Sequence, residues 1–154
     1  MFEGMDAMQR EFADAVATSD DVGEQIRCAA EAHIRHHARR ALAAYVNTYE
    51  IPSLEEPWRT ELIERRRAYA RHWTELIERG VELGVCRVRS PRLAAFAIID
   101  MGIGVARWYR VEGPLSEATI ATLYGQMALR IVGVDAGADA HRDLVAQAGS
   151  DAAP

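Results

Sequence analysis

Apolar residues recur three and four positions apart along most of the chain, which is the spacing of one face of an α-helix. Segments that alternate apolar and polar residues, as half-buried strands do, are missing from the sequence. We therefore predict an all-α fold, an antiparallel bundle of about five helices. The predicted helices cover residues 1–18, 21–49, 57–83, 91–109 and 116–132.

Cap and breaker residues mark most of the predicted boundaries. Asp21, Ser90 and Ser116 each stand where a short side-chain oxygen can accept a hydrogen bond from the first turn of a helix. Gly84 and Gly133 follow two of the helices, where glycine readily adopts the left-handed conformation that ends a helix. The pattern therefore predicts where most of the helices begin and end.

The helices predicted over residues 91–109 and 116–132 are apolar on two faces. A helix without a solvent face must be covered on both sides, and too few other helices are available to do this. We therefore predict that these two helices pair with their copies in a homodimer, as a four-helix interface. The interface is predicted to contain nine residues: Phe96, Ile98, Gly102, Val105, Ile120, Leu123, Tyr124, Met127 and Ile131.

Length and composition indicate one soluble domain. The 154 residues are 49% hydrophobic and 27% charged, which is ordinary for a globular protein. We predict a domain over residues 1–134 and a flexible tail over residues 135–154, in which residues 140–148 could form a short helix. Cys28 and Cys86 lie far apart without a CxxC spacing, so we expect reduced thiols in the cytoplasm.

The net charge of −5 and the mixing of basic with acidic residues argue against binding of nucleic acid by this chain. No apolar run is long enough to span a membrane. Motifs of nucleotide binding and of nucleophilic catalysis are missing, so we expect neither an enzyme nor a cofactor.

A few polar residues interrupt the apolar faces of the predicted helices. His33 and His37 share one helical face, and this spacing would also suit a metal, although no third ligand is evident. We interpret them as polar residues that line a cavity or as core histidines, and we predict no metal site. Arg66 interrupts an apolar stripe, where its guanidinium needs a carboxylate or a ligand anion, so either a structural ion pair or a binding role fits. Asp100 and Arg107 could pair with other helices.

Aromatic, arginine and glycine residues at helical spacing, followed by a turn and a last helix, carry a family resemblance. These residues are Arg66, Tyr69, Trp73, Ile77, Gly80, Gly84-Val85, Pro91 to Ala95, Gly102 to Trp108, Gly113 to Ser116 and Leu123-Tyr124. The run resembles the ligand-binding C-terminal domain of TetR/AcrR-family transcriptional regulators. It is most similar to an actinobacterial branch that includes repressors of acyl-CoA and steroid catabolism.

The resemblance implies a homodimer, an effector cavity in each subunit, and repression that is relieved by a small hydrophobic or CoA-thioester ligand. It also implies a DNA-reading helix-turn-helix that precedes this domain, and we expect residue 1 to lie in the helix that follows it. Aromatic walls with a few converging polar groups are typical of effector sites. The predicted effector-binding residues are His33, His37, Arg66, Tyr69, Trp73, Arg107 and Trp108, with Tyr45 as a further possible wall.

Two other functions remain open at this point. The chain could be a stand-alone helical interaction module that pairs with full-length regulators and blocks them. It could also be a helical metal-binding protein built on His33 and His37.

Overall fold

The computed structural model describes residues 2–41 and 53–134, and this part of the chain contains helices and no strand. The helices are α1 (Phe2–Val16), α2 (Val22–Arg39), α4 (Trp58–Glu82), α5 (Pro91–Trp108) and α6 (Glu117–Ile131). The predicted all-α bundle is confirmed.

Side-chain caps begin three of these helices at the predicted residues. Asp21 Oδ1 accepts from the backbone N–H of Glu24 across 2.8 Å, at the start of α2. Ser90 caps α5 and Ser116 caps α6 in the same way. Gly84 follows α4 with a φ of 73°, in the left-handed region where glycine has no steric cost.

The end of α2 differs from the prediction. The helix ends at Arg39, and Arg40 leaves the helical region with φ −124° and ψ 40°, although apolar spacing continues beyond it. No proline or glycine stands there, so the sequence pattern holds no signal for the end. Residues 42–52, with Tyr45, and the predicted tail over residues 135–154 lie outside the described part of the chain.

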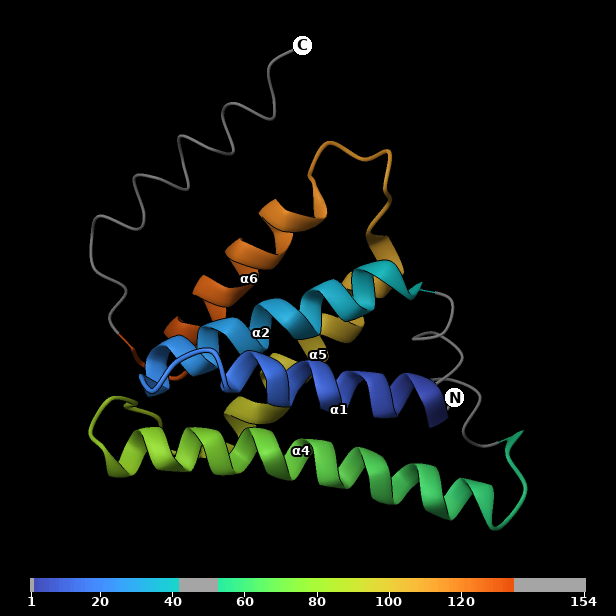
Figure 1. Ribbon diagram of the computed structural model, residues 1–154, viewed down its shortest axis with the longest axis horizontal. Helices are drawn as coiled ribbons and strands as arrows, with labels where there is room; N and C mark the ends of the chain where they lie inside the picture. The colour runs from blue at the N-terminus through green and yellow to red at the C-terminus, as the bar shows by residue number, and fades with distance from the viewer. Residues whose placement is uncertain (1, 42–52, 135–154) are drawn as a thin grey trace.

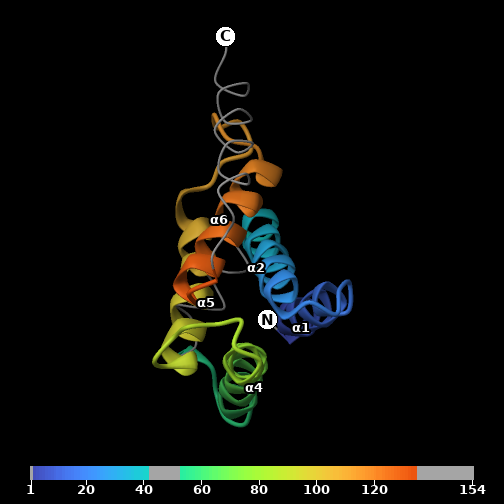
Figure 2. The ribbon, with the colours of Figure 1, turned by 90° about the vertical axis from the view of Figure 1, so that its left-hand side faces the viewer.

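Helix α2 is the centre of the bundle and contacts α1, α4, α5 and α6. Figure 1 shows α4 and α6 on opposite sides of α2, and Figure 2 shows α1 and α5 on its other two sides. Ile26 of α2, Trp73 and Ile77 of α4, and Ile98 of α5 are buried in the main core. A smaller cluster joins α2, α5 and α6: Ile34, Ala38, Val105, Tyr109, Ile120 and Ala121. None of the described helices has the length and apolar character that crossing a membrane requires.

Candidate functional site

A buried hydrogen-bonded histidine joins three helices at the centre of the molecule. His33 of α2 is only 2% exposed. Its Nε2 lies 3.1 Å from the carbonyl oxygen of Ile99 on α5, and its Nδ1 lies 2.8 Å from the hydroxyl of Tyr69 on α4. A carbonyl only accepts, so Nε2 carries the proton and the Tyr69 hydroxyl donates to Nδ1. Burial lowers the pKa of His33 to about 4, which keeps this ring neutral.

Gly102 of α5 allows this histidine to lie against the helix backbone. A Cβ atom at position 102 would overlap Cδ2 and Nε2 of His33. The ring of Trp73 closes the other side, with its centroid 6.3 Å from that of His33. The close neighbours of Gly102 are therefore His33 and His37 of the same chain, and its role at a dimer interface stays a prediction.

His37 lies one turn beyond His33, with the two ring centroids 4.5 Å apart. Its side chain is 6% exposed, and neither ring nitrogen has a hydrogen-bond partner among the described residues. Burial, together with the charges of His33, His36 and Arg66, lowers the pKa of His37 to about 2. A neutral imidazole has one donor and one acceptor, and a buried polar atom without a partner costs about 1–3 kcal/mol. Such a group calls for a functional explanation.

The arrangement of these histidines does not suit a metal ion. Both ring nitrogens of His33 are engaged, by Tyr69 and by Ile99. Within residues 2–41 and 53–134, no cluster of three or more His, Cys, Asp or Glu side chains could hold a metal.

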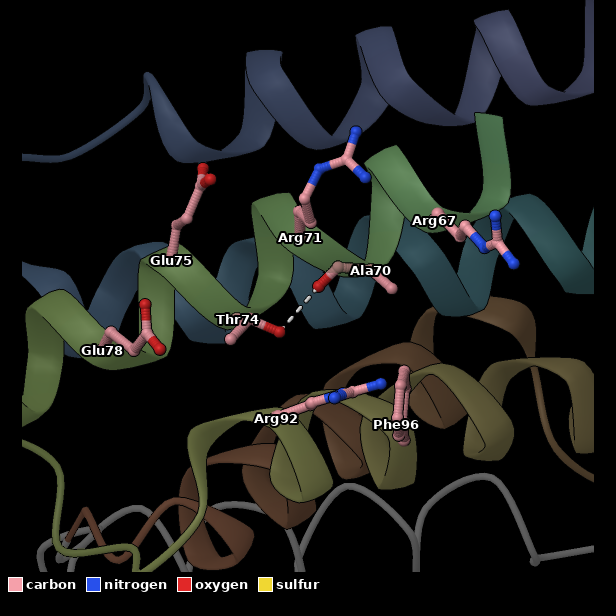
Figure 3. A pocket seen from close by; sticks show the side chains of 8 residues that line it. All are labelled: Arg67, Ala70, Arg71, Thr74, Glu75, Glu78, Arg92 and Phe96. Carbon is pink, nitrogen blue, oxygen red and sulfur yellow. Dashed lines mark hydrogen bonds between the residues drawn. The ribbon is translucent and has the colours of Figure 1, made fainter. Parts of the chain in front are cut away.

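A groove runs between α4 and α5 on the surface (Figure 3). It consists of two adjoining hollows of about 460 and 300 Å³, which share Arg67, Ala70 and Phe96. The larger hollow is also lined by Arg71, Thr74, Glu75, Glu78 and Arg92, and the smaller by Ile63 and Arg66.

Charged side chains line both walls of the groove, and α5 adds an aromatic ring. Figure 3 shows Thr74 and Glu78 on the side of α4 that faces Arg92 and Phe96 of α5. The Arg92 guanidinium lies 5.4 Å from the centroid of the Phe96 ring, a cation–π arrangement. The groove therefore offers both an aromatic surface and cationic groups.

Arg66 connects the groove with the buried histidines. It lines the smaller hollow, and its charge contributes to the lowered pKa of His37. Burial lowers the pKa of Arg66, and the negative charge of Asp100 on α5 opposes this effect. The interruption of the apolar stripe at position 66 thus marks a half-buried cation at the edge of a cavity.

The structure brings together most of the predicted effector residues and separates two of them. His33, His37, Tyr69 and Trp73 are clustered, with Arg66 beside them. Arg107 and Trp108 are exposed at the end of α5, about 9 Å further along the helix axis than Gly102. Trp108 is 48% exposed and packs edge-on against Tyr109, outside this cluster.

Sequence reasoning missed the groove residues Arg67, Arg92 and Phe96. The spacing of Arg92 and Phe96, four residues apart on one helix, is a usable signal for a side-chain pair. Nothing in the sequence places that pair opposite Arg67, because this requires the packing of α4 on α5.

Four of the nine predicted interface residues are buried within the single chain. They are Ile98, Gly102, Val105 and Ile120. Phe96 and Met127 are 38% and 41% exposed, while Leu123, Tyr124 and Ile131 are half-buried. The inner face of α5 and α6 therefore packs on α2, and a different face points outward.

A family model described as the tetracyclin repressor-like C-terminal domain matches residues 19–132. The chain belongs to this family, the C-terminal domains of TetR-type transcription regulators. A comparison with curated protein sequences found no match.

Solved structures of TetR-family regulators share the fold. A TetR-family regulatory protein from Rhodococcus RHA1 is 27% identical, with a TM-score of 0.80 over 87% of this chain and 70% of that chain. The regulator PfmR from Thermus thermophilus is 26% identical, with a TM-score of 0.75 over 84% of this chain and 70% of its own. AibR, solved with isovaleryl coenzyme A and operator DNA, is 19% identical, with a TM-score of 0.72 over 86% of this chain and 71% of its own.

Proposed function

We propose that the chain is the effector-sensing and homodimerising domain of a TetR-family repressor. The observation that carries the sensing role is His37, a buried neutral imidazole whose two ring nitrogens lack partners among the described residues. Binding sites of small molecules combine an apolar lining with a few polar groups of this kind. In this proposal DNA is contacted through a helix-turn-helix of the regulator, and not through the helices described above.

The contacts of His33 suggest how a ligand would act on the fold. His33 ties α2 to α4 through Tyr69 and to α5 through the carbonyl of Ile99. A ligand that enters between α4 and α5 would favour a different spacing of these helices. A ligand shifts such an equilibrium only by its difference in affinity for the two arrangements, so contacts at this junction are the relevant ones.

Exposed apolar side chains on α5 and α6 support the dimerising role. Leu93 is 66% exposed, and Phe96, Trp108 and Met127 are also exposed, as is Val111 just beyond α5. Exposed apolar side chains that gather on neighbouring helices are typical of interaction surfaces. A second copy of the chain, related by a twofold axis, would cover these side chains on both subunits.

We propose a small hydrophobic compound or an acyl thioester as the effector. AibR binds isovaleryl coenzyme A, and its likeness to this chain concerns the fold. The aromatic and aliphatic lining contributed by Phe96 and Ile63 suits an acyl chain.

Two measurements test this proposal. Light scattering is expected to give twice the chain mass of 17.1 kDa. Isovaleryl coenzyme A is expected to raise the melting temperature, whereas coenzyme A alone, which lacks the acyl group, raises it less. A monomer would contradict the dimerising role, and equal shifts with both compounds would contradict recognition of the acyl group.

A further inference from the structure

The exposed face of α5 carries two opposite charges, Asp100 and Arg107, on the side of the helix away from the buried Ile98 and Val105. Seven residues are almost two full turns, so the two side chains share one face, about 10 Å apart along the helix axis. Within residues 2–41 and 53–134 neither of them is part of an ion pair, although the charge of Asp100 acts on Arg66 of α4. The single chain thus presents a negative and a positive group on one exposed helix face.

Gly104 lies between these two charges on the same face. A Cβ atom there would meet no atom of the described chain within 4 Å, whereas at Gly102 it would overlap the His33 ring. Packing within the subunit therefore gives no reason for a glycine at position 104, although glycine weakens the interior of a helix. A second helix that crosses α5 at this point would give the reason, because a residue without a side chain lets two helix backbones approach closely.

Apolar side chains flank Gly104 along this face. Leu93 is 66% exposed, Trp108 is 48% exposed, and Ala97 is exposed as well. Spacings of four and seven residues keep all three on the same face as Gly104. A helix that crossed α5 at Gly104 would therefore cover apolar surface on both sides of the crossing.

Building on the proposed homodimer, we infer that α5 crosses α5 of a second copy antiparallel at Gly104, with Asp100 of each copy paired to Arg107 of the other. A twofold axis perpendicular to α5 reverses the second helix, so residues equally far from the crossing face each other. Asp100 and Arg107 stand four and three residues to either side of Gly104, which meets this condition. A parallel crossing would instead place Asp100 opposite Asp100, and like charges repel. The charge pattern therefore selects both the partner and the direction of the crossing.

Charge reversal in the whole chain tests the pairing. Asp100→Arg and Arg107→Asp each place like charges opposite each other, so each should raise the dissociation constant of the dimer about tenfold in sedimentation over a concentration series. An equimolar mixture of the two variants restores both attractive pairs, so it should form heterodimers about as tightly as the original chain dimerises. Native mass spectrometry identifies these heterodimers by mass. A dissociation constant that neither variant changes, or a mixture that associates no better than each variant alone, overturns the inference.

Glu82→Arg is the matched control for the change in net charge. Glu82 is exposed near the end of α4, so its reversal changes the charge of the chain as Asp100→Arg does, but outside the proposed crossing. We expect it to leave the dissociation constant of the dimer unchanged. A rise as large as that caused by Asp100→Arg would mean that net charge weakens the dimer, and the inference would fail.

Gly104→Cys tests the crossing point. A disulfide needs Cα atoms about 4.4–6.8 Å apart, which two copies of residue 104 satisfy only where the helices cross. Ala97→Cys is the matched control on the same face, because the proposed crossing holds two copies of residue 97 about 20 Å apart. After mild oxidation, non-reducing electrophoresis should show a cross-linked dimer for Gly104→Cys and much less for Ala97→Cys, with Cys28 and Cys86 present in both. Equal cross-linking by the two variants, or none by Gly104→Cys, overturns the crossing at Gly104.

The result is separable from the proposed function. If the original chain is a dimer and charge reversal at positions 100 and 107 leaves its dissociation constant unchanged, only the antiparallel crossing of α5 is wrong. If the original chain is a monomer at every concentration, the proposed homodimer fails together with the crossing. Circular dichroism of each variant confirms that it is folded.

Discussion

At position 102 the backbone of α5 comes into direct contact with the ring of His33. Because that ring is buried and hydrogen-bonded on both nitrogens, it cannot move aside for an added methyl group. Such a position tolerates glycine alone, although glycine lowers the intrinsic stability of a helix.

Gly102→Ala is therefore expected to destabilise the protein by about 1–3 kcal/mol, which urea unfolding measures. His33→Ala removes the ring that the new methyl group would overlap. In that background Gly102→Ala should cost much less, so the two substitutions should be strongly non-additive. Additive effects would mean that the His33 ring is not what restricts position 102.

Buried histidines also make stability depend on pH; they are His33, His36 and His37, and burial lowers the pKa of each. Burial lowers the pKa of His33 to about 4 and that of His37 to about 2, whereas both titrate near 6.5 in the unfolded chain. Below pH 6.5 the unfolded chain therefore binds more protons than the folded one. Stability is complete above pH 6.5 and falls as the pH falls towards 4, by up to about 1.4 kcal/mol per pH unit for each histidine.

Urea unfolding at several pH values between 7.5 and 4.5 measures this slope. His37→Gln should reduce the slope, because one of the buried neutral imidazoles is removed. A free energy of unfolding that is constant across this window would contradict the burial of neutral rings.

Individual side chains were predictable only where helical spacing places them. The spacing of His33 and His37 correctly puts both on one helix face, and Arg66 stands out as a charge within an apolar stripe. The hydrogen bond between His33 and Ile99 involves a backbone carbonyl, which carries no signature in the sequence. The packing of Gly102 against the His33 ring likewise leaves no signature in the sequence.

Helix boundaries were predictable where a side chain makes the cap. Ser116 starts α6 by accepting a hydrogen bond from the N–H of Thr119, 3.1 Å away. The end of α2 at Arg39 has no such marker in the sequence. The apolar spacing also continues past Arg39, so periodicity does not show where the helix ends. Periodicity shows that α5 has two apolar faces, but it does not show which of them packs on α2.

The cap at Ser116 can be tested directly. Ser116→Ala is expected to destabilise the protein by about 1 kcal/mol, because the N–H of Thr119 loses its acceptor. Ser116→Asp keeps an acceptor and adds a charge that favours the helix N-terminus, so it should match the original stability. Thermal unfolding of the three proteins measures the difference, and equal melting temperatures for alanine and serine would argue against the cap.

At the scale of the whole molecule, α5 and α6 each have an inner face, which packs on α2, and an outer face, which does not. The inner residues Ile98, Val105 and Ile120 stabilise the subunit. The outer residues are exposed in the single chain, and they include Phe96, which also lines the groove. The proposed interface and the proposed ligand site therefore meet on α5, so a ligand in the groove could alter how two subunits are arranged.

Met127→Arg tests the outer surface of α6 as the interface. Met127 is 41% exposed in the single chain, so an arginine there should leave the subunit folded but place an unpaired charge in a dimer interface. We expect the dissociation constant of the dimer to rise by about thirtyfold or more, which is roughly 2 kcal/mol, in sedimentation or light scattering over a concentration series. Val81→Arg is the matched control, because Val81 is a similarly exposed apolar residue, 38% exposed, on α4. If Val81→Arg gave monomers while Met127→Arg did not, the dimer would form through α4, and the outer faces of α5 and α6 would need another partner.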